Sequence, residues 1–176
     1  CRFLLLNYKP HGMGERSMKS RYLMSTLCAA ALAGSAMVAY AADGPHDDAI
    51  KARQAMFQTY SFNIGILGAM AKGKMDYDAS LAAESAANLE AAANFGQSAY
   101  WPVGSDSETD GNARTRALPA IWEDMAGVGE KAQALKDAAA NMSLEAGNGL
   151  DALRGAMGDL GGTCKGCHDN YRAEKK

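Results

Sequence analysis

Two cysteines and a histidine within five positions near the carboxyl end constrain this chain more than any other feature. They are Cys164, Cys167 and His168, in the segment GGTCKGCHDN at residues 161–170. Positions i, i+3 and i+4 of a helix project from one face. The two thiols and the imidazole are therefore expected to point in the same direction.

The amino-terminal part of the chain reads as an export signal. Residues 18–41, MKSRYLMSTLCAAALAGSAMVAYA, begin with two basic side chains, continue with a short apolar run and end in Ala39-Tyr40-Ala41. This pattern is typical of a secretory signal peptide, and its apolar part is too short to span a membrane stably. We expect cleavage after Ala41, and we expect residues 1–17 to be upstream or added sequence ahead of a natural start at Met18.

Cleavage would leave one domain, residues 42–176, with a net negative charge. The first 41 residues hold five of the 18 Lys and Arg side chains and one of the 20 Asp and Glu side chains, so the remainder carries a charge of −6. An acidic chain lacks the basic patch that binding to nucleic acid needs. We predict neither a nucleic-acid partner nor membrane insertion of the mature chain.

Three kinds of chemistry use a Cys-x-x-Cys pair, and the histidine that follows separates them. A redox-active dithiol of the thioredoxin type is expected after a strand in a βαβ unit. A zinc site needs four ligands, or three and a water, and His46 is the only other histidine after residue 41. Covalent attachment of haem is the chemistry for which C-x-x-C-H is the established pattern, with two thiols bonded to the porphyrin and the histidine bound to iron. The motif favours haem, which in c-type proteins is attached outside the cytoplasm, in agreement with the export signal.

The rest of the chain shows helical patterns throughout. Apolar residues recur at helical spacing over 47–71, and the alanine-rich stretch 78–95 favours a helix. Glycine, proline and small polar residues mark a long loop over 96–113. Helical pattern resumes over 114–142, and a last helix carries the motif. We predict an all-α fold, an antiparallel four-helix bundle with covalently attached haem.

The helix ends and the glycines of the last helix carry further expectations. Asp78 is a candidate cap, Pro119 a start or a kink, and Ser143 a candidate cap of the last helix. The last helix also contains a row of glycines away from the motif, each costing about 1 kcal/mol against alanine. Close approach of a neighbouring helix is one reason for this row, which consists of Gly155, Gly158, Gly162 and Gly166.

A four-helix chain with C-x-x-C-H at the end of its last helix resembles the cytochrome c′ family. The likeness covers nearly all of residues 46–172 and rests on RQAMF (53–57), GAMAKGK (68–74), WPVGSD (101–106), ARTRALPAIWED (113–124) and TCKGCHDNYR (163–172). The resemblance implies an exported haem protein with five-coordinate iron that binds nitric oxide and carbon monoxide. It also implies a homodimer formed through the first two helices, and a periplasmic location.

The resemblance assigns roles to residues at both ends of the chain. Cys164 and Cys167 correspond to the thioether attachments and His168 to the proximal iron ligand. Arg172 corresponds to the basic residue beside that histidine.

Further correspondences fall in the first helix and the long loop. Arg53 and Gln54 match a pair near the haem edge, and a guanidinium at residue 53 can pair with a propionate. Asp106 corresponds to a loop acid that touches the haem. Trp122 is expected to pack near the haem.

The position over the open face of the iron decides the function. In that family the position lies four residues after the first-helix arginine, so the resemblance assigns it to Phe57. A phenylalanine ring cannot coordinate iron, whereas low-spin relatives carry a methionine there. Met56 lies one residue earlier, about 100° around the helix, so only one of the two can face the metal. Met70 and Met75 are expected in the core and in a turn.

Two functional hypotheses follow. With Phe57 over the metal, the sixth position is apolar and suits NO or CO better than O₂, which needs a hydrogen bond. With Met56 as sixth ligand, the protein is a low-spin electron carrier that serves redox partner proteins. No distal His–Arg pair for peroxide cleavage is visible in the sequence, so we do not expect an enzyme.

Overall fold

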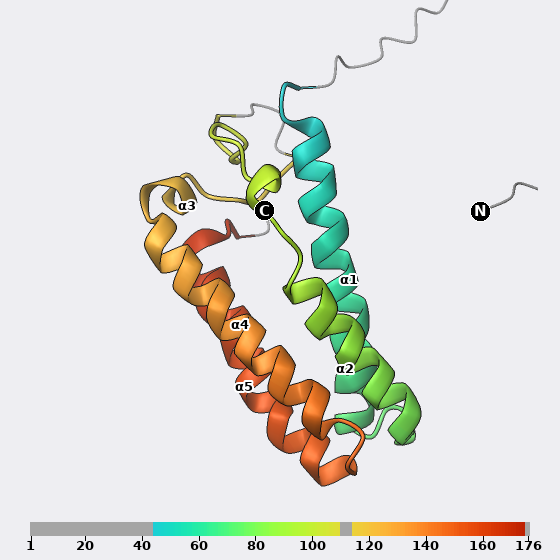
Figure 1. Cartoon of the computed structure of the whole chain (residues 1–176). Coiled ribbons are helices and arrows are strands. Elements are labelled where there is room, and N and C mark those ends of the chain that lie inside the picture. Colours follow the sequence, from blue (N-terminus) through green and yellow to red (C-terminus); the bar gives the residue numbers. More distant parts are fainter. Residues whose placement is uncertain (1–43, 110–113, 175–176) are drawn as a thin grey trace, which may run out of the picture. The chain divides into compact units, whose positions relative to one another are not determined.

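The computed structural model describes residues 44–109 and 114–174, which are helical and contain no strand. The predicted signal peptide at 18–41 and residues 1–17 lie outside the described residues. The elements, in chain order, are α1 (Asp47–Ala71), α2 (Ala79–Ala93), the 3-10 helix η1 (Ser98–Tyr100), α3 (Ala120–Glu123), α4 (Met125–Glu145) and α5 (Leu150–Tyr171) (Figure 1).

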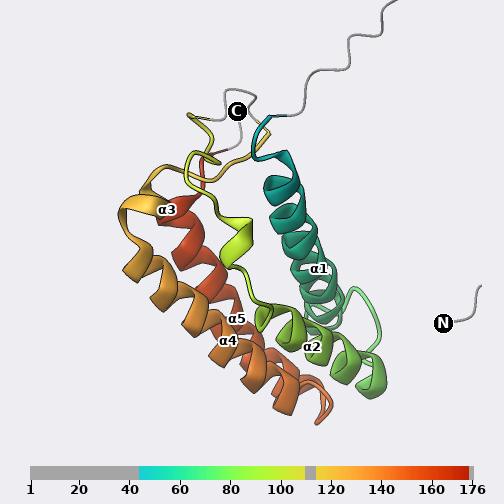
Figure 2. The ribbon, with the colours of Figure 1, turned by 45° about the horizontal axis from the view of Figure 1, so that its top comes forward.

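The four long helices form the predicted antiparallel bundle. Helix α1 packs against α2 and α5, α2 packs against α4, and α4 packs against α5. Figures 1 and 2 show the four helices side by side, with the chain direction alternating from one to the next. Within the described ranges, no helix is both long and apolar enough to cross a membrane.

The helix ends have identifiable local causes. The side chain of Asp78 accepts a hydrogen bond from the Leu81 N–H at 2.9 Å, which confirms the predicted cap of α2. Glycine occupies left-handed backbone after α1 at Gly73 (φ 67°) and before α5 at Gly149 (φ 122°). The prediction that Ser143 caps the last helix is wrong, because Ser143 lies inside α4 and the chain turns only at Gly149.

The segment predicted to resume as helix at residue 114 remains extended as far as Pro119. Pro119 is the N-cap of α3, and the residue before a proline disfavours helix. Residues 116–118 instead pair with residues near the carboxyl end of the chain, where Ala117 and Arg172 form an antiparallel bridge. Helix α3 is therefore a single turn, and α4 begins after Asp124, whose side chain accepts from the Gly127 N–H at 2.9 Å.

The hydrophobic core draws on all four long helices. Its largest buried side chains are Leu67, Met70, Leu89, Met142, Leu153 and Leu160. Full burial of one such side chain stabilises the fold by about 1.5–3 kcal/mol. Met70 lies in this core and Met75 is exposed in the turn after α1, so both methionines lie where they were expected.

Candidate functional site

A cavity of about 1030 Å³ opens between α1, α4, α5 and the extended segment before α3. Its walls are largely apolar. The apolar side chains that line it include Ile64, Ile121, Val128, Leu135 and Met157.

The structure brings Cys164, Cys167 and His168 to this one cavity, as the helical spacing predicts. All three are half-buried side chains of α5 that line the cavity. Neither cysteine is in a disulfide. Burial raises the pKa of both thiols, so they remain protonated at neutral pH.

His168 is held as a neutral imidazole. Burial lowers its pKa, and the positive charges of Arg172 and Arg116 lower it further. Arg172 Nη1 lies 3.2 Å from His168 Nε2. Because a guanidinium can only donate, Nε2 is the accepting nitrogen and carries the lone pair.

Helix α1 contributes Phe57 to another wall of the cavity. The ring is 42% exposed and makes edge-to-face contacts with Tyr60 at 5.6 Å and Trp101 at 6.3 Å between centroids. Met56 is 5% exposed and packs in the hydrophobic core, and it does not line the cavity. Phe57 and Met56 therefore lie on different faces of α1.

Arg53 lies in the same wall but holds the neighbouring loop. Its guanidinium, 2% exposed, donates to Ser105 Oγ at 2.8 Å, to the Ser105 carbonyl and to Thr115 Oγ1 at 2.6 Å. It also lies over the Trp101 ring at 4.8 Å from the centroid. The pairing of Arg53 with a propionate stays a prediction. No local sequence pattern indicates the contacts with Ser105 and Thr115, since these partners lie about 50 or more residues away.

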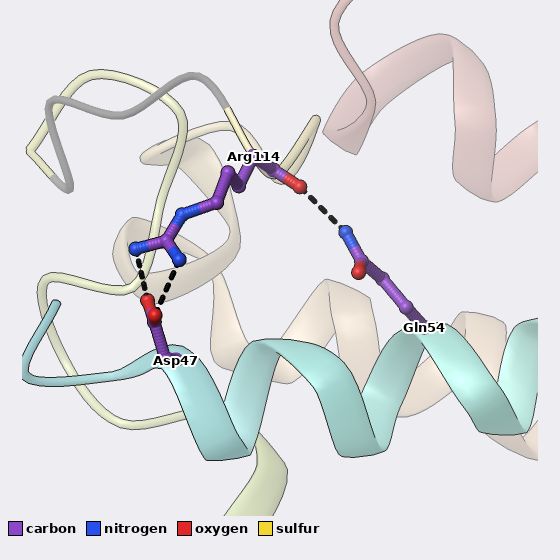
Figure 3. Close-up of polar contacts among 3 residues, drawn as sticks. All are labelled: Asp47, Gln54 and Arg114. Carbon is purple, nitrogen blue, oxygen red and sulfur yellow. Dashed lines mark hydrogen bonds and ion pairs between the residues drawn. The ribbon is translucent and has the colours of Figure 1, made fainter. Parts of the chain in front are cut away.

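Gln54 also lines the cavity and reaches the extended segment before α3. Its side chain donates to the Arg114 carbonyl at 2.5 Å, and the Arg114 guanidinium forms an ion pair with the buried carboxylate of Asp47 (Figure 3). Sequence reasoning missed both Asp47 and Arg114. The only local signal at Asp47 is that an acidic residue suits the first turn of a helix.

Two other expected residues lie beside the cavity without lining it. Asp106 is buried, and its carboxylate accepts the N–H groups of Glu108 at 2.8 Å and Thr109 at 2.7 Å. Burial raises its pKa, but these hydrogen bonds outweigh burial and the net pKa is lowered. The ring nitrogen of Trp122 donates to the Trp101 carbonyl at 3.1 Å. In this structure Asp106 orders the loop and Trp122 supports Trp101.

A hydrogen-bonded tyrosine fixes the end of α5. Tyr171 lines the cavity, and its hydroxyl donates to Asp124 Oδ2 at 2.5 Å. The bond to Asp124 raises the pKa of Tyr171 to about 12. The same bond, with that from the Gly127 N–H, lowers the pKa of Asp124.

The arrangement fits a haem better than the other two chemistries. A dithiol of the thioredoxin type would follow a strand, whereas here the motif lies within a long helix of a bundle. In the described part of the chain, no group of three or more His, Cys, Asp or Glu side chains could hold a metal ion by itself. A large apolar cavity with two free thiols and one neutral imidazole on the same helix suits a porphyrin with a ligated iron.

Comparisons with known proteins agree with this chemistry. A family model described as cytochrome C′ matches residues 48–172. A cytochrome c′ of Cereibacter sphaeroides is 38% identical over 155 residues, which cover 88% of this chain and 99% of that protein. A cytochrome c-554 of the same species is 40% identical over 124 residues, covering 70% and 91%.

Solved structures show the same fold. Cytochrome c′ from Thermochromatium tepidum superposes with a TM-score of 0.67 at 31% identity, covering 76% of this chain and all of that one. Cytochrome c prime from Alcaligenes xylosoxidans, in a ferrous arginine-to-lysine variant with bound NO, gives a TM-score of 0.63 at 32% identity, covering 73% and 96%.

Proposed function

The chain belongs to the cytochrome c′ family, whose members carry covalently attached haem c, and we propose that it is an exported periplasmic protein that binds NO and CO at five-coordinate iron. The observation that carries the proposal is the presence of Phe57, and not a methionine, in the α1 wall of the cavity that holds His168. A related structure is described as having NO bound and another as having carbon monoxide bound. Export is supported by the leader pattern at 18–41.

The residues of α5 would hold the cofactor. Cys164 and Cys167 would form the thioether links and His168 would bind the iron through Nε2, whose lone pair would then no longer accept the hydrogen bond from Arg172. The haem supplies a metal that binds a diatomic ligand and exchanges one electron. His168 is suited to this role because burial and the charges of Arg172 and Arg116 keep its imidazole neutral.

The residues of α1 would make the gas-binding face apolar and hindered. Phe57 has no hydrogen-bond donor, and the nearby donors of Arg53 and Gln54 are bonded to Ser105, Thr115 and the Arg114 carbonyl. A face without donors disfavours polar O₂ adducts relative to NO and CO. The ring must also move aside before a ligand binds.

The competing function, a low-spin electron carrier, requires a methionine sulfur at the iron. Met56 is buried in the core, which supports the gas-binding function over this one. An enzyme that cleaves peroxide would need a distal histidine, and among the described residues that line the cavity only His168 is a histidine. We therefore propose no catalytic activity.

Visible spectra of the reduced holoprotein, with and without CO or NO, test the proposal. We expect a high-spin spectrum that changes on addition of either gas. A sharp low-spin spectrum that ignores CO would exclude gas binding and favour a methionine-ligated electron carrier.

The partner we propose is a second copy of this chain, bound through α1 and α2. Phe62 on α1 is 70% exposed, and Leu81 on α2 and Phe95 after it are also exposed. A related solved structure is described as a cytochrome c′ with ligand-controlled dimer dissociation. Exposed apolar side chains on one helix pair are typical of such an interface.

A further inference from the structure

The extended segment of residues 114–118, here named the strap, joins two walls of the cavity. In Figures 1 and 2 the amino-terminal end of α1 and the carboxyl-terminal end of α5 stand apart, and the segment leading into α3 runs between them. Residues 114–117 line the cavity that also contains Phe57 and His168. The contacts that hold the strap can therefore affect the positions of both walls.

On the α1 side, the strap is held through Arg114 and Thr115. The two nitrogens of the Arg114 guanidinium contact the two carboxylate oxygens of Asp47, and Gln54 donates to the Arg114 carbonyl (Figure 3). Asp47 is buried, so water weakens this ion pair less than it weakens a surface pair. Arg53 adds its bond to Thr115 Oγ1.

On the α5 side, the strap is held by backbone bonds just beyond the iron-binding motif. The Leu118 N–H donates to the Tyr171 carbonyl at 3.1 Å, and the Ala173 N–H donates to the Arg116 carbonyl at 2.9 Å. The Arg116 guanidinium in turn donates a hydrogen bond to the Ala173 carbonyl. These contacts begin three residues after His168 and fix the last turn of α5.

We propose that Arg114 is a positioning residue. By binding Asp47, it holds the strap on α1 and so sets how far the Phe57 wall stands from the turn of α5 that carries His168. That separation controls how readily Phe57 gives way to an entering gas. The inference rests on the proposed gas-binding function.

The experiment compares Asp47→Asn and Arg114→Gln with the wild-type holoprotein. Asp151→Asn is the matched control, since Asp151 pairs with Arg154 on the exposed face of α5 and neither residue lines the cavity. Three quantities are measured: amide hydrogen exchange at Leu118 and Ala173, the iron–histidine stretching frequency by resonance Raman, and the CO association rate.

Both strap variants are expected to speed exchange at the two amides and CO association by about three- to tenfold, within the range typical of coupled side-chain networks, and to shift the iron–histidine frequency. The control should match the wild type. Arg114→Lys keeps the charge but loses the two-pronged contact, so its exchange rates, iron–histidine frequency and CO rate should lie between those of the wild type and of Arg114→Gln. If a strap variant does not fold, Arg114→Lys is measured in its place.

Lower thermal stability with unchanged exchange, frequency and CO rate in every strap variant would overturn the inference. A wild-type protein that does not bind CO would instead refute the proposed function. Amide exchange does not require a bound gas. The effect of the strap variants on the Leu118 and Ala173 amides can therefore be measured whether or not the protein binds CO.

Discussion

At the scale of single residues, the proposed gas-binding function depends most on Phe57. The ring is held by Tyr60 and Trp101 at its edges and lines the same cavity as His168. Displacement of the ring would lose these two aromatic contacts and therefore has a free-energy cost. This cost should appear as a barrier to gas entry.

Phe57→Ala is therefore expected to accelerate CO association about tenfold or more, since each 1.4 kcal/mol of barrier corresponds to a factor of ten. Flash photolysis of the CO complex measures the rate. Leu144→Ala is the control, because Leu144 is an exposed side chain of α4 that lies outside both the cavity and the proposed dimer interface. An unchanged rate in Phe57→Ala would show that the ring does not stand over the metal.

The free energy of unfolding should depend on pH through the carboxyl group of Asp124. Its bonds from Tyr171 and from the Gly127 N–H lower its pKa below the ordinary value of 3.8. A carboxyl group whose pKa is lower in the folded state adds stability above its unfolded pKa and loses that contribution as pH falls through the folded pKa.

Asp124→Asn should therefore destabilise the protein at pH 7, and the difference from the wild type should shrink below about pH 4. Urea unfolding at pH 7 and pH 3 measures both differences. In a Tyr171→Phe background, the effect of Asp124→Asn at pH 7 should be smaller, because the first cause of the pKa shift is gone. Equal effects in the two backgrounds would show that the two side chains are not coupled.

The placement of residues could be predicted from the sequence where it depends on helical spacing. The common face of Cys164, Cys167 and His168 follows from i, i+3 and i+4, and the separation of Phe57 from Met56 follows from 100° per residue. The contacts of Arg53 and Arg114 could not be predicted, because they join α1 to a loop about 50 to 70 residues away. No local sequence pattern encodes contacts between residues so far apart along the chain.

At the scale of elements, the glycines of α4 and α5 differ in what surrounds them. A Cβ on Gly127 would lie 2.2 Å from Asp124 Oδ2 and 2.6 Å from the Tyr171 hydroxyl, so the bond between Asp124 and Tyr171 requires a glycine there. A Cβ on Gly129, two residues further along α4, would meet nothing within 4 Å.

Gly127→Ala is expected to destabilise the fold by about 1–3 kcal/mol through overpacking. Gly129→Ala is the matched control and should stabilise it by about 0.5–1 kcal/mol. Chemical denaturation of both variants measures the free energies of unfolding. If Gly127→Ala and Gly129→Ala changed the free energy of unfolding in the same direction, the packing at Gly127 would be looser than these distances indicate.

Close helix packing does not explain the glycine row of α5. A Cβ at Gly155, Gly158 or Gly162 would touch nothing within 4 Å, and only Gly166 approaches a neighbour, the Lys131 ammonium at 3.8 Å. We have no physical account of these glycines. The helix ends were predictable where a side chain caps the first turn, as at Asp78, but not at Ser143, because helix-favouring residues carried α4 on to Glu145.

At the scale of the whole molecule, the proposed dimer would bury the exposed apolar side chains of α1 and α2. Phe62→Lys should abolish or weaken dimerisation at least about tenfold, because a charged side chain at the centre of an apolar interface opposes its burial. Sedimentation equilibrium measures the dissociation constant. Leu144→Lys, at an exposed leucine on α4, is the control and should leave the dimer intact. A wild-type protein that sediments as a monomer would refute the dimer itself.

The two proposed sulfur anchors, Cys164 and Cys167, lie within one turn of α5, and this would affect how the molecule recovers from unfolding. A chain that loses its bundle would keep its porphyrin, because thioether bonds are covalent and survive unfolding, and the short spacing of the two tethers would keep the porphyrin beside the same turn of polypeptide. Refolding should therefore be first order and independent of any free pigment in solution, unlike that of a globin that must recapture its cofactor. Repeated unfolding by heat or denaturant should therefore leave the haem absorbance of the protein unchanged.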